Sequence, residues 1–462
     1  MSLVRIRLLT SGALACLIAW AGAAPAAASE VLRVDGRDVD VVFDPYLPSR
    51  AATDLPPPPQ PATPDAGSLP IRDAQAGASV YAVIEAAVAA GRITPSGADA
   101  FRSIYDEGRQ LRRHLPQARR AQLSSVVVNL ERMAGAGLLT PDRMPAVFLQ
   151  LERNVEFWRA RGVPRAGTRV TFSGSPVIFQ FYPGEGLALQ PLANFGKANA
   201  LYASCTDPNP KLPPCRRDQL KLLLDWMSAL PAPRGSQGAV AWEYYFRFGG
   251  GRPPWTSGLS QGTGVQAMAR GSRLLGDAAY LESARAGLGV FEAKPPVGVR
   301  VPSAGGAHYL LYSFNSRLRV LNGFLQAVTG LFDVARISGD PRARALFSAG
   351  DRAARRELPR YDTRQWSLYS LGGSRSDVGY HKLVRDFLRN LCERTRARVY
   401  CTTARRFTRQ LRSPRTVRRF AGPRRTRGRP PGQLRAALPG PARVGLRIEE
   451  GRRILEFTKV AP

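Results

Sequence analysis

A helix–Gly-Asp–helix pattern occurs twice in the chain and limits its architecture more than any other feature. The segments are LLGDAAYL, from Leu274 to Leu281, and ISGDPRARALF, from Ile337 to Phe347. Glycine ends a helix because it adopts the left-handed conformation, and aspartate caps the helix that follows. A helical hairpin that recurs along a chain indicates stacked αα-hairpins sharing a core. We therefore expect residues 191–401 to form an (α/α) toroid or barrel of helical hairpins.

Two regions of different pattern precede these hairpins. From about residue 79 to 162 apolar residues recur with a helical period, and Thr94-Pro95 and Thr140-Pro141 each indicate a capping threonine followed by proline. The stretch RVTFSGSPVIFQFY, residues 169–182, alternates and is rich in β-branched and aromatic residues, as strands are. We predict a small helical domain at 76–165 and a β-rich segment at 166–190. The predicted fold class is mainly α with a smaller β part.

The N-terminal region divides into three parts. Arg5 and Arg7 precede a short apolar run and then a stretch of small residues, which is the layout of a secretory signal peptide cleaved near Ala28. Residues 29–75 hold an alternating pattern around Asp35-Gly36, typical of a β-hairpin, and then a proline-rich linker. We predict a signal peptide at 1–28 and a secreted or cell-surface protein, with membrane attachment only through that segment or an uncleaved anchor.

Four cysteines remain after the predicted cleavage site: Cys205, Cys215, Cys392 and Cys401. Four cysteines allow three pairings, and the sequence does not choose among them. Local pairing within each close pair is the simplest arrangement in an oxidising compartment. Neither pair has the spacing or the histidine partners of a zinc site, so we predict neither a metal nor a cofactor.

The chain carries a large excess of positive charge. It holds 67 Lys and Arg against 35 Asp and Glu, a formal net charge of +32. Such an excess concentrates anionic partners near the protein. For an exported protein we expect an anionic uronic-acid polysaccharide or another cell-surface polyanion, and no nucleic acid. Residues 402–462 form a basic Arg/Pro-rich tail, interpreted either as a polyanion-binding or poorly ordered segment or as a small β-module around Glu450-Gly451.

Three tyrosines, Tyr312, Tyr369 and Tyr380, stand at the edges of Gly-rich or helical segments, and Arg375 and His381 lie near them in the sequence. Removing a hydrogen beside a carboxylate and returning it to the other face needs two protic groups and stabilisation of the enolate. A phenol has a pKa of about 10 and is a poor base unless a neighbouring cation lowers that pKa. We therefore expect an arginine beside the reacting phenols.

Five motifs between residues 181 and 388 resemble the C-terminal domain of the D-glucuronyl C5-epimerases. They are YPGEGLALQPLANFGKANALY, PWTSGLSQGTGVQAMAR, VLNGFLQAVTGLFDVA, LPRYDTRQWSLYSL and GYHKL. The family converts glucuronic to iduronic acid units in heparosan-type polymers, and the resemblance implies a β-rich part followed by an (α/α) barrel. It also implies catalytic tyrosines at the three positions above. The chain departs from the family at Leu310-Leu311, where paired glutamates are expected, and at Gly372, where an arginine is expected.

These motifs lead to a set of residue roles. We predict Tyr312 and Tyr380 as the proton-transferring pair, with Tyr369 positioning the carboxylate or assisting. The remaining predicted substrate-binding residues are polar or aromatic side chains in the same motifs, with SGLSQGTG bringing backbone close to a sugar: His381, Arg375, His308, Gln261, Trp255, Tyr182, Gln190 and Asn322.

Two other functions fit the same residues. A polysaccharide lyase shares the first proton abstraction and then expels the C4 substituent, and a non-catalytic polyanion-binding protein would retain the groove without turnover. The sequence favours the epimerase, and it leaves open whether the protein forms a homodimer.

Overall fold

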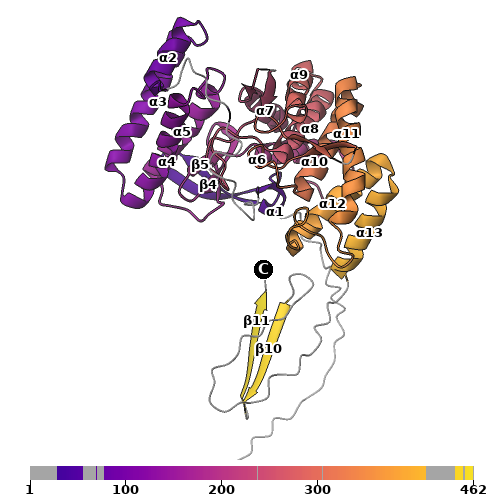
Figure 1. Ribbon diagram of the computed structural model, residues 1–462. Helices are drawn as coiled ribbons and strands as arrows, with labels where there is room; N and C mark the ends of the chain where they lie inside the picture. Colours follow the sequence, from indigo (N-terminus) through magenta and orange to yellow (C-terminus); the bar gives the residue numbers. More distant parts are fainter. Residues whose placement is uncertain are drawn as a thin grey trace, which may run out of the picture.

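The computed structural model describes residues 29–55, 69, 77–236, 238–303 and 305–412, and the backbone of two strands at 443–450 and 453–460. The predicted signal peptide, most of the proline-rich linker and the part of the basic tail at 413–442 lie outside the described residues. Figure 1 shows a body made mainly of helices with a smaller β part, so the predicted fold class is confirmed.

A five-stranded sheet joins two parts of the sequence that we had predicted separately. The antiparallel hairpin of β1 (Ser29–Asp35) and β2 (Asp38–Asp44) is present, and β1 also pairs in parallel with β3. The remaining strands are β3 (Arg169–Phe172), β4 (Ser175–Tyr182) and β5 (Gly186–Leu189), in the order β2-β1-β3-β4-β5. Leu32 and Val34 of β1 are buried beside this sheet, which explains why the hairpin docks on it.

Four helices form the predicted helical region: α2 (Val80–Ala89), α3 (Pro95–His114), α4 (Gln117–Gly135) and α5 (Met144–Ala160). Thr94 caps α3 as expected, because its hydroxyl accepts the Gly97 amide at 3.1 Å. The cap predicted at Thr140-Pro141 is wrong. Residues 140–143 form a separate turn, and Pro145 occupies the start of α5.

Four helical hairpins follow. They are α6 (Pro191–Thr206) with α7 (Arg217–Ser228), α8 (Gly258–Leu275) with α9 (Ala278–Ala286), α10 (Leu321–Ser338) with α11 (Pro341–Glu357), and α12 (Val378–Thr395) with α13 (Arg398–Arg412). The first helices of the hairpins pack in the order α6, α8, α10, α12, and each partner packs on its outer side (Figure 1). The short helix α1 (Arg50–Thr53) contacts both α6 and α12, the first and last inner helices. This is the (α/α) arrangement that the repeated pattern predicted.

The two Gly-Asp turns behave as the sequence indicated. Gly276 and Gly339 end α8 and α10 with φ of 75° and 67°. Asp277 accepts the Ala279 amide at 2.9 Å and Asp340 accepts the Arg342 amide at 2.7 Å, so each aspartate caps the next helix.

The other two hairpins lack the Gly-Asp turn and carry the disulfides instead. Cys205 near the end of α6 is bonded to Cys215, which lies just before α7, and Cys392 of α12 is bonded to Cys401 of α13. Both bonds are the local pairings expected from the sequence. The α12–α13 turn contains Arg396 at φ 55° where the Gly-Asp turns have glycine.

Short elements between the hairpins carry the loops of the candidate site. They are β6 (Ala232–Arg234) with β7 (Ala239–Ala241), β8 (Arg300–Ser303) with β9 (Gly306–Tyr309), and the 3₁₀ turns η2 (Gly287–Phe291) and η3 (Leu358–Arg360). Strands β10 (Arg443–Glu450) and β11 (Arg453–Val460) pair antiparallel, which confirms the hairpin predicted around Glu450-Gly451. Within the described ranges, no helix is both long and apolar enough to cross a bilayer.

Candidate active site

The three predicted catalytic tyrosines come from different loops and meet at one place. Tyr312 lies between β9 and α10, Tyr369 lies between η3 and α12, and Tyr380 lies in the first turn of α12. The rings of Tyr369 and Tyr380 have centroids 5.0 Å apart, and the side chains of Tyr312 and Tyr369 influence each other's ionisation. Tyr369 therefore lies close to both Tyr380 and Tyr312. We call the three residues the tyrosine cluster.

Hydrogen bonds to the backbone hold the hydroxyl of Tyr380. It donates to the Tyr369 carbonyl at 2.7 Å and accepts the Asn322 amide at 3.1 Å. Asp377 caps α12 by accepting the Tyr380 amide at 2.8 Å, which fixes this residue at the helix start. Tyr380 thus ties the loop of Tyr369 to the first turn of α10, and its own proton is engaged in the protein.

The hydroxyl of Tyr369 is different. Its oxygen is buried and, among the described residues, makes no hydrogen bond of ordinary geometry, although the Tyr312 side chain lies close enough to lower its pKa. A buried polar atom without a partner is costly, and such atoms gather at functional sites. The Tyr369 side chain as a whole is half-buried, whereas Tyr312 is fully buried.

Burial dominates the ionisation of the cluster. It raises the pKa of Tyr312, Tyr369 and Tyr380 above that of an ordinary phenol, because the phenolate loses its hydration. The other groups that shift these pKa values are phenols and backbone amides of the described residues. No arginine of the described residues is a cause of these shifts, so the expected arginine beside the phenols is not found in that part of the chain. Arg319, near Tyr312 in the sequence, is instead drawn to the buried carboxylate of Glu357.

An aromatic wall stands behind Tyr312. Its ring lies 5.1 Å from Phe314 and 6.1 Å from both Phe248 and Trp255. Trp255 is completely buried, stacks on Tyr244 at 4.3 Å and donates its indole N–H to a backbone carbonyl. Trp255 therefore supports the tyrosine cluster from inside the core and does not line an open groove as predicted.

A chain of polar side chains runs beneath this wall. Gln190 donates to the Tyr182 hydroxyl at 2.7 Å and accepts from the Tyr244 hydroxyl at 3.0 Å, and Tyr244 contacts Ser260 at 2.8 Å. Gln190 is fully buried, with both ends of its amide engaged. Its predicted contact with substrate is not supported. Tyr182 is half-buried and lies beside Phe246 and Phe248.

The segment SGLSQGTG is buried helix and not a loop that approaches a sugar. It forms the first turns of α8, where Gln261 bonds to the backbone of Trp242, Val240 and Gly287. A Cβ added at Gly262 would lie 2.7 Å from the Ala327 Cα of α10. The glycines serve close packing of α8 on α10, so the predicted roles of this segment and of Gln261 in binding are wrong.

The predicted cationic residues also have other partners. His381 is fully buried, stacks on Trp366 with centroids 3.7 Å apart, and bonds through Nδ1 to the Ser367 hydroxyl at 2.8 Å. Arg375 is exposed and donates to the Gln365 amide oxygen at 3.0 Å. Both residues brace the loop that carries Tyr369, and neither contacts a phenol of the cluster in the described structure.

Two further predicted residues lie nearby but are enclosed. His308 is fully buried, and its Nδ1 lies 2.9 Å from the Glu357 carboxylate. Burial lowers the pKa of His308, which the contact with Glu357 partly offsets. Asn322 is buried at the start of α10, where its side-chain oxygen accepts the Gly323 amide at 2.7 Å and its own amide binds Tyr380.

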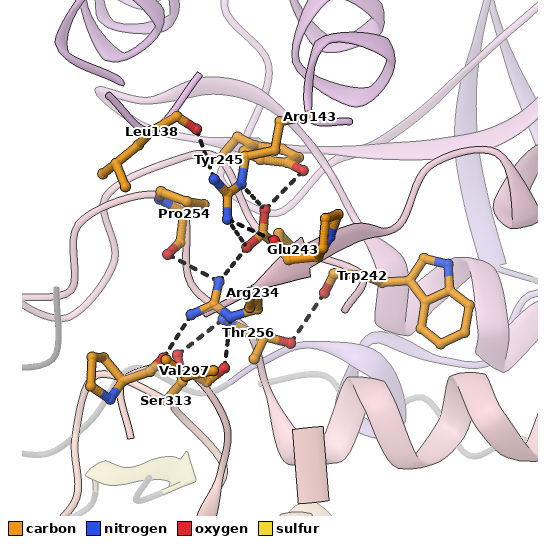
Figure 2. A network of polar contacts seen from close by, with 12 residues as sticks. Leu138, Arg143, Arg234, Trp242, Glu243, Tyr245, Pro254, Thr256, Val297 and Ser313 are labelled. Atoms are coloured by element: carbon orange, nitrogen blue, oxygen red, sulfur yellow. Dashed lines mark hydrogen bonds and ion pairs between the residues drawn. The ribbon is translucent and has the colours of Figure 1, made fainter. Parts of the chain in front are cut away.

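A buried ion network was missed from the sequence because its members are far apart along the chain. Glu243, fully buried, forms ion pairs with Arg143 at 2.7 Å and with Arg234 (Figure 2). Arg143 precedes α5, whereas Arg234 lies in β6, so the network joins the helical region to the hairpin array. The two guanidinium groups hold the pKa of Glu243 below its usual value although burial opposes this.

The same network reaches toward Tyr312. Arg234 donates to the Pro254 carbonyl at 3.3 Å (Figure 2). Close by along the chain, the Thr256 carbonyl accepts the amide of Ser313, which is the neighbour of Tyr312. The amide of Thr256 donates to the Ser313 hydroxyl at 3.1 Å. The charged network therefore anchors the loop on which Tyr312 lies.

Comparison with known proteins finds similarity to a family over the part of the chain that holds this site. Residues 236–409 match the family model "D-glucuronyl C5-epimerase C-terminus". A D-glucuronyl C5-epimerase of Caenorhabditis elegans is 33% identical over 132 residues, which are 26% of this chain and 21% of that enzyme. An uncharacterised protein of Methanocaldococcus jannaschii is 25% identical over 168 residues, 35% of this chain and 54% of the relative.

Among solved structures, a cellobiose 2-epimerase from Bacillus thermoamylovorans is similar at 11% identity and a TM-score of 0.36, over 66% of this chain and 77% of that one. The chain thus spans about a fifth of the nematode enzyme and about half of the archaeal relative. Over residues 236–409, a range that includes the three tyrosines, the chain is similar to the C-terminal domain of the D-glucuronyl C5-epimerases.

Proposed function

We propose that this protein is an exported carbohydrate epimerase that converts D-glucuronyl to L-iduronyl units at C5 within an acidic polysaccharide. The observation that carries the proposal is the hydroxyl of Tyr369, which is buried, is not bonded to the backbone, interacts with the Tyr312 side chain and lies beside Tyr380. The family match over residues 236–409 supports the same conclusion. Disulfides between all four cysteines of the described chain fit an oxidising compartment.

The reaction needs a base on one face of the sugar and an acid on the other. As the phenolate, Tyr369 takes the C5 proton, and the C–H electron pair becomes an enolate of the adjacent carboxylate. A neutral phenol of the cluster then gives its proton to the opposite face of C5; this is Tyr312 or, once its bond to the Tyr369 carbonyl opens, Tyr380. One proton leaves carbon and one returns, so the product is the epimer, and the phenols exchange protons with water afterwards.

The raised pKa values of the three phenols suit the proton donor of the reaction better than they suit the base. Because burial keeps Tyr312 and Tyr380 protonated, both remain proton donors across the physiological range. The base has to be the phenol that ionises most readily. Burial raises the pKa of Tyr369, but Tyr369 suits this role because the Tyr312 side chain partly offsets that rise and because its own hydroxyl is not committed to the backbone. This shifts the base from the Tyr312–Tyr380 pair expected from the sequence to Tyr369.

A second candidate is a polymer-binding protein without turnover. The observation that favours it lies at Leu310 and Leu311, which are completely buried where the family resemblance implies paired glutamates. The Gly258 amide binds the Leu310 carbonyl at 3.1 Å, so this segment packs into the core and offers no carboxylate to the cluster.

Incubation of the full chain with heparosan in heavy water separates these functions. We expect deuterium at C5, detected by mass spectrometry and NMR, with the polymer length unchanged. New unsaturated chain ends that absorb ultraviolet light would identify a lyase instead. Polymer that binds but never exchanges its C5 hydrogen would contradict the proposal and support the binding protein.

A further inference from the structure

A buried carboxylate at the end of α11 holds an arginine whose backbone contacts the loop of Tyr369. Glu357 is 2% exposed. It accepts hydrogen bonds from the Ser303 hydroxyl and from His308 Nδ1, which lies 2.9 Å away. Arg319 Nη1 lies 3.5 Å from the same carboxylate and donates to the Ser303 hydroxyl at 2.7 Å. We call Ser303, His308, Arg319 and Glu357 the Glu357 cluster.

The Glu357 cluster contains one fixed ion pair. Burial raises the pKa of Glu357, but the bonds from His308 and Ser303 and the charge of Arg319 outweigh this, so that pKa lies below its usual value. Burial also lowers the pKa of His308, which favours the neutral imidazole. Because a carboxylate only accepts hydrogen bonds, the proton of the neutral imidazole lies on Nδ1. The carboxylate of Glu357 is therefore balanced by the guanidinium of Arg319 alone.

The backbone of Arg319 is bonded to the loop that carries Tyr369. Its carbonyl accepts the Leu371 amide at 2.9 Å, and the Leu321 amide donates to the Tyr369 carbonyl at 3.3 Å. An antiparallel bridge joins the two residues that lie between these bonds. The two segments therefore form a short antiparallel ladder, with Tyr369 at one end.

The same ladder reaches Tyr380. The Tyr369 carbonyl, which accepts the Leu321 amide, also accepts the hydroxyl of Tyr380, and that hydroxyl in turn accepts the Asn322 amide. The segment 319–322 thus holds two elements that carry phenols, the Tyr369 loop and the first turn of α12. Because the side chain at the start of this segment is paired with Glu357, the buried carboxylate is connected to both phenols through one residue.

We propose that Glu357 is a positioning residue for proton transfer at C5, which acts through Arg319 and the ladder by fixing Tyr369 relative to Tyr380. This inference deepens the proposed function and rests on it for the role of Tyr369. Without the carboxylate, the guanidinium of Arg319, which is 27% exposed, loses its charged partner and turns to water. A displacement of reacting groups by about 1 Å costs about 10²-fold in rate. The loss therefore falls on the chemical step and leaves binding of the polymer intact.

The test compares two variants of the full chain that each neutralise one buried carboxylate. Glu357→Gln changes the cluster, and Asp333→Asn changes a carboxylate that pairs with Arg270 at 2.7 Å and Arg394 at 2.9 Å. Asp333 is the matched control because it lies on α10, 11 residues beyond Asn322 and about 16 Å along the helix from the ladder.

The measured quantities are kcat and KM for exchange of the C5 hydrogen in heparosan. In Glu357→Gln we expect kcat to fall about 10–100-fold with KM within about two-fold of wild type. In Asp333→Asn both should stay within about two-fold after correction for the folded fraction. An equal loss of kcat in the two variants, or a change in KM alone, would overturn the proposal. Should Glu357→Gln fail to fold, Arg319→Gln decides the same question, because that side chain is only half-buried.

A double variant tests the path through Arg319. Arg319→Gln alone should reproduce the loss of kcat, and Glu357→Gln combined with Arg319→Gln should lose no more than the larger single loss, because the two groups act as one unit. Losses that multiply would show that Glu357 does not act through Arg319.

Amide hydrogen exchange reports on the ladder without turnover. Mass spectrometry of the peptides that contain Leu321 and Leu371 should show exchange about ten-fold faster in Glu357→Gln and unchanged in Asp333→Asn. Unchanged protection in Glu357→Gln would overturn the proposal. A wild type that never exchanges the C5 hydrogen would refute the epimerase, while faster amide exchange in Glu357→Gln would still show that this carboxylate fixes the ladder. Normal C5 exchange in Glu357→Gln would do the reverse.

Discussion

The tyrosine cluster and the Glu357 cluster are joined by the segment 319–322 and differ in charge. Burial holds the phenols of the tyrosine cluster in the protonated form. Burial raises the pKa of Glu357 too, yet its partners outweigh this and keep the carboxylate ionised. Proton transfer at carbon needs groups that release a proton in a site without water, while positioning needs an ion pair that stays charged. The comparison teaches that this chain separates the two tasks in space and assigns them to different residues.

Replacing Tyr369 should have the largest effect on C5 exchange and no effect on heparosan binding. For Tyr369→Phe we expect C5 exchange to fall by about 10²–10⁴-fold, the range for loss of a general acid or base, with heparosan binding unchanged. Tyr309→Phe is a matched control, because its buried hydroxyl bonds the Leu346 carbonyl away from the cluster. Exchange within two-fold of wild type in Tyr369→Phe would remove Tyr369 from the mechanism.

Removing the buried carboxylate of Glu243 should have the next largest effect, on the free energy of unfolding. Glu243→Gln leaves Arg143 and Arg234 without a charged partner in the core, which costs about 3–5 kcal/mol of unfolding free energy. Glu282→Gln, an exposed partner of Arg285, should change stability by about 0.5 kcal/mol or less. Denaturant titration measures both. Equal effects would show that the network in Figure 2 does not support the fold.

The α12–α13 disulfide lies at the far end of the hairpin that carries Tyr380. Replacing Cys392 and Cys401 with alanine should lower the unfolding free energy by about 2–3 kcal/mol for a loop of this length. Because Cys392 lies 12 residues beyond Tyr380, about 18 Å along α12, C5 exchange per folded molecule and heparosan binding should both stay unchanged. Exchange that falls more than the folded fraction would show that this end of the hairpin also holds the tyrosine cluster.

C5 exchange and heparosan binding should respond differently to pH. A base that reacts as phenolate becomes about ten-fold more abundant per pH unit below its pKa, so C5 exchange should rise with pH up to about 10 without a plateau. Heparosan binding should stay flat over that interval, because guanidinium remains charged. A plateau in exchange below pH 9 would contradict Tyr369 as a buried base. The stability that burial of neutral phenols provides is present below pH 10 and is lost above it.

Loss of one helix cap should give the smallest effect. Asp340→Ala removes the acceptor for two amides at the start of α11, at a cost of about 1 kcal/mol in the thermal unfolding free energy. C5 exchange and heparosan binding should persist, because Asp340 lies at the opposite end of α11 from Glu357. A change in exchange greater than the change in folded fraction would implicate this end of α11 in the site.

Features determined by neighbouring residues were predictable from the sequence. The Gly-Asp turns were found because glycine and aspartate act on the helix ends beside them, and both disulfides join cysteines 9 or 10 residues apart. The convergence of the tyrosines followed from family motifs. In these cases the local chemistry and the tertiary structure agree.

Features created by contacts between distant segments were not predictable in the same way. SGLSQGTG was interpreted as a segment that brings backbone close to a sugar, yet its glycines permit close packing of α8 against α10. Glu243 and Arg143 lie 100 residues apart, so no pattern joins them. An arginine beside the phenols was expected from the chemistry, but of the loop arginines Arg375 is bonded to Gln365 and Arg364 lines a cleft on the outer side of the loop.

The most direct test is the structure of the full chain with a bound heparosan oligosaccharide. We expect one uronate with its C5 about 3–3.5 Å from the Tyr369 hydroxyl oxygen and a second phenol on the opposite face of that ring. An oligosaccharide bound without any ring at the tyrosine cluster would contradict the proposed mechanism.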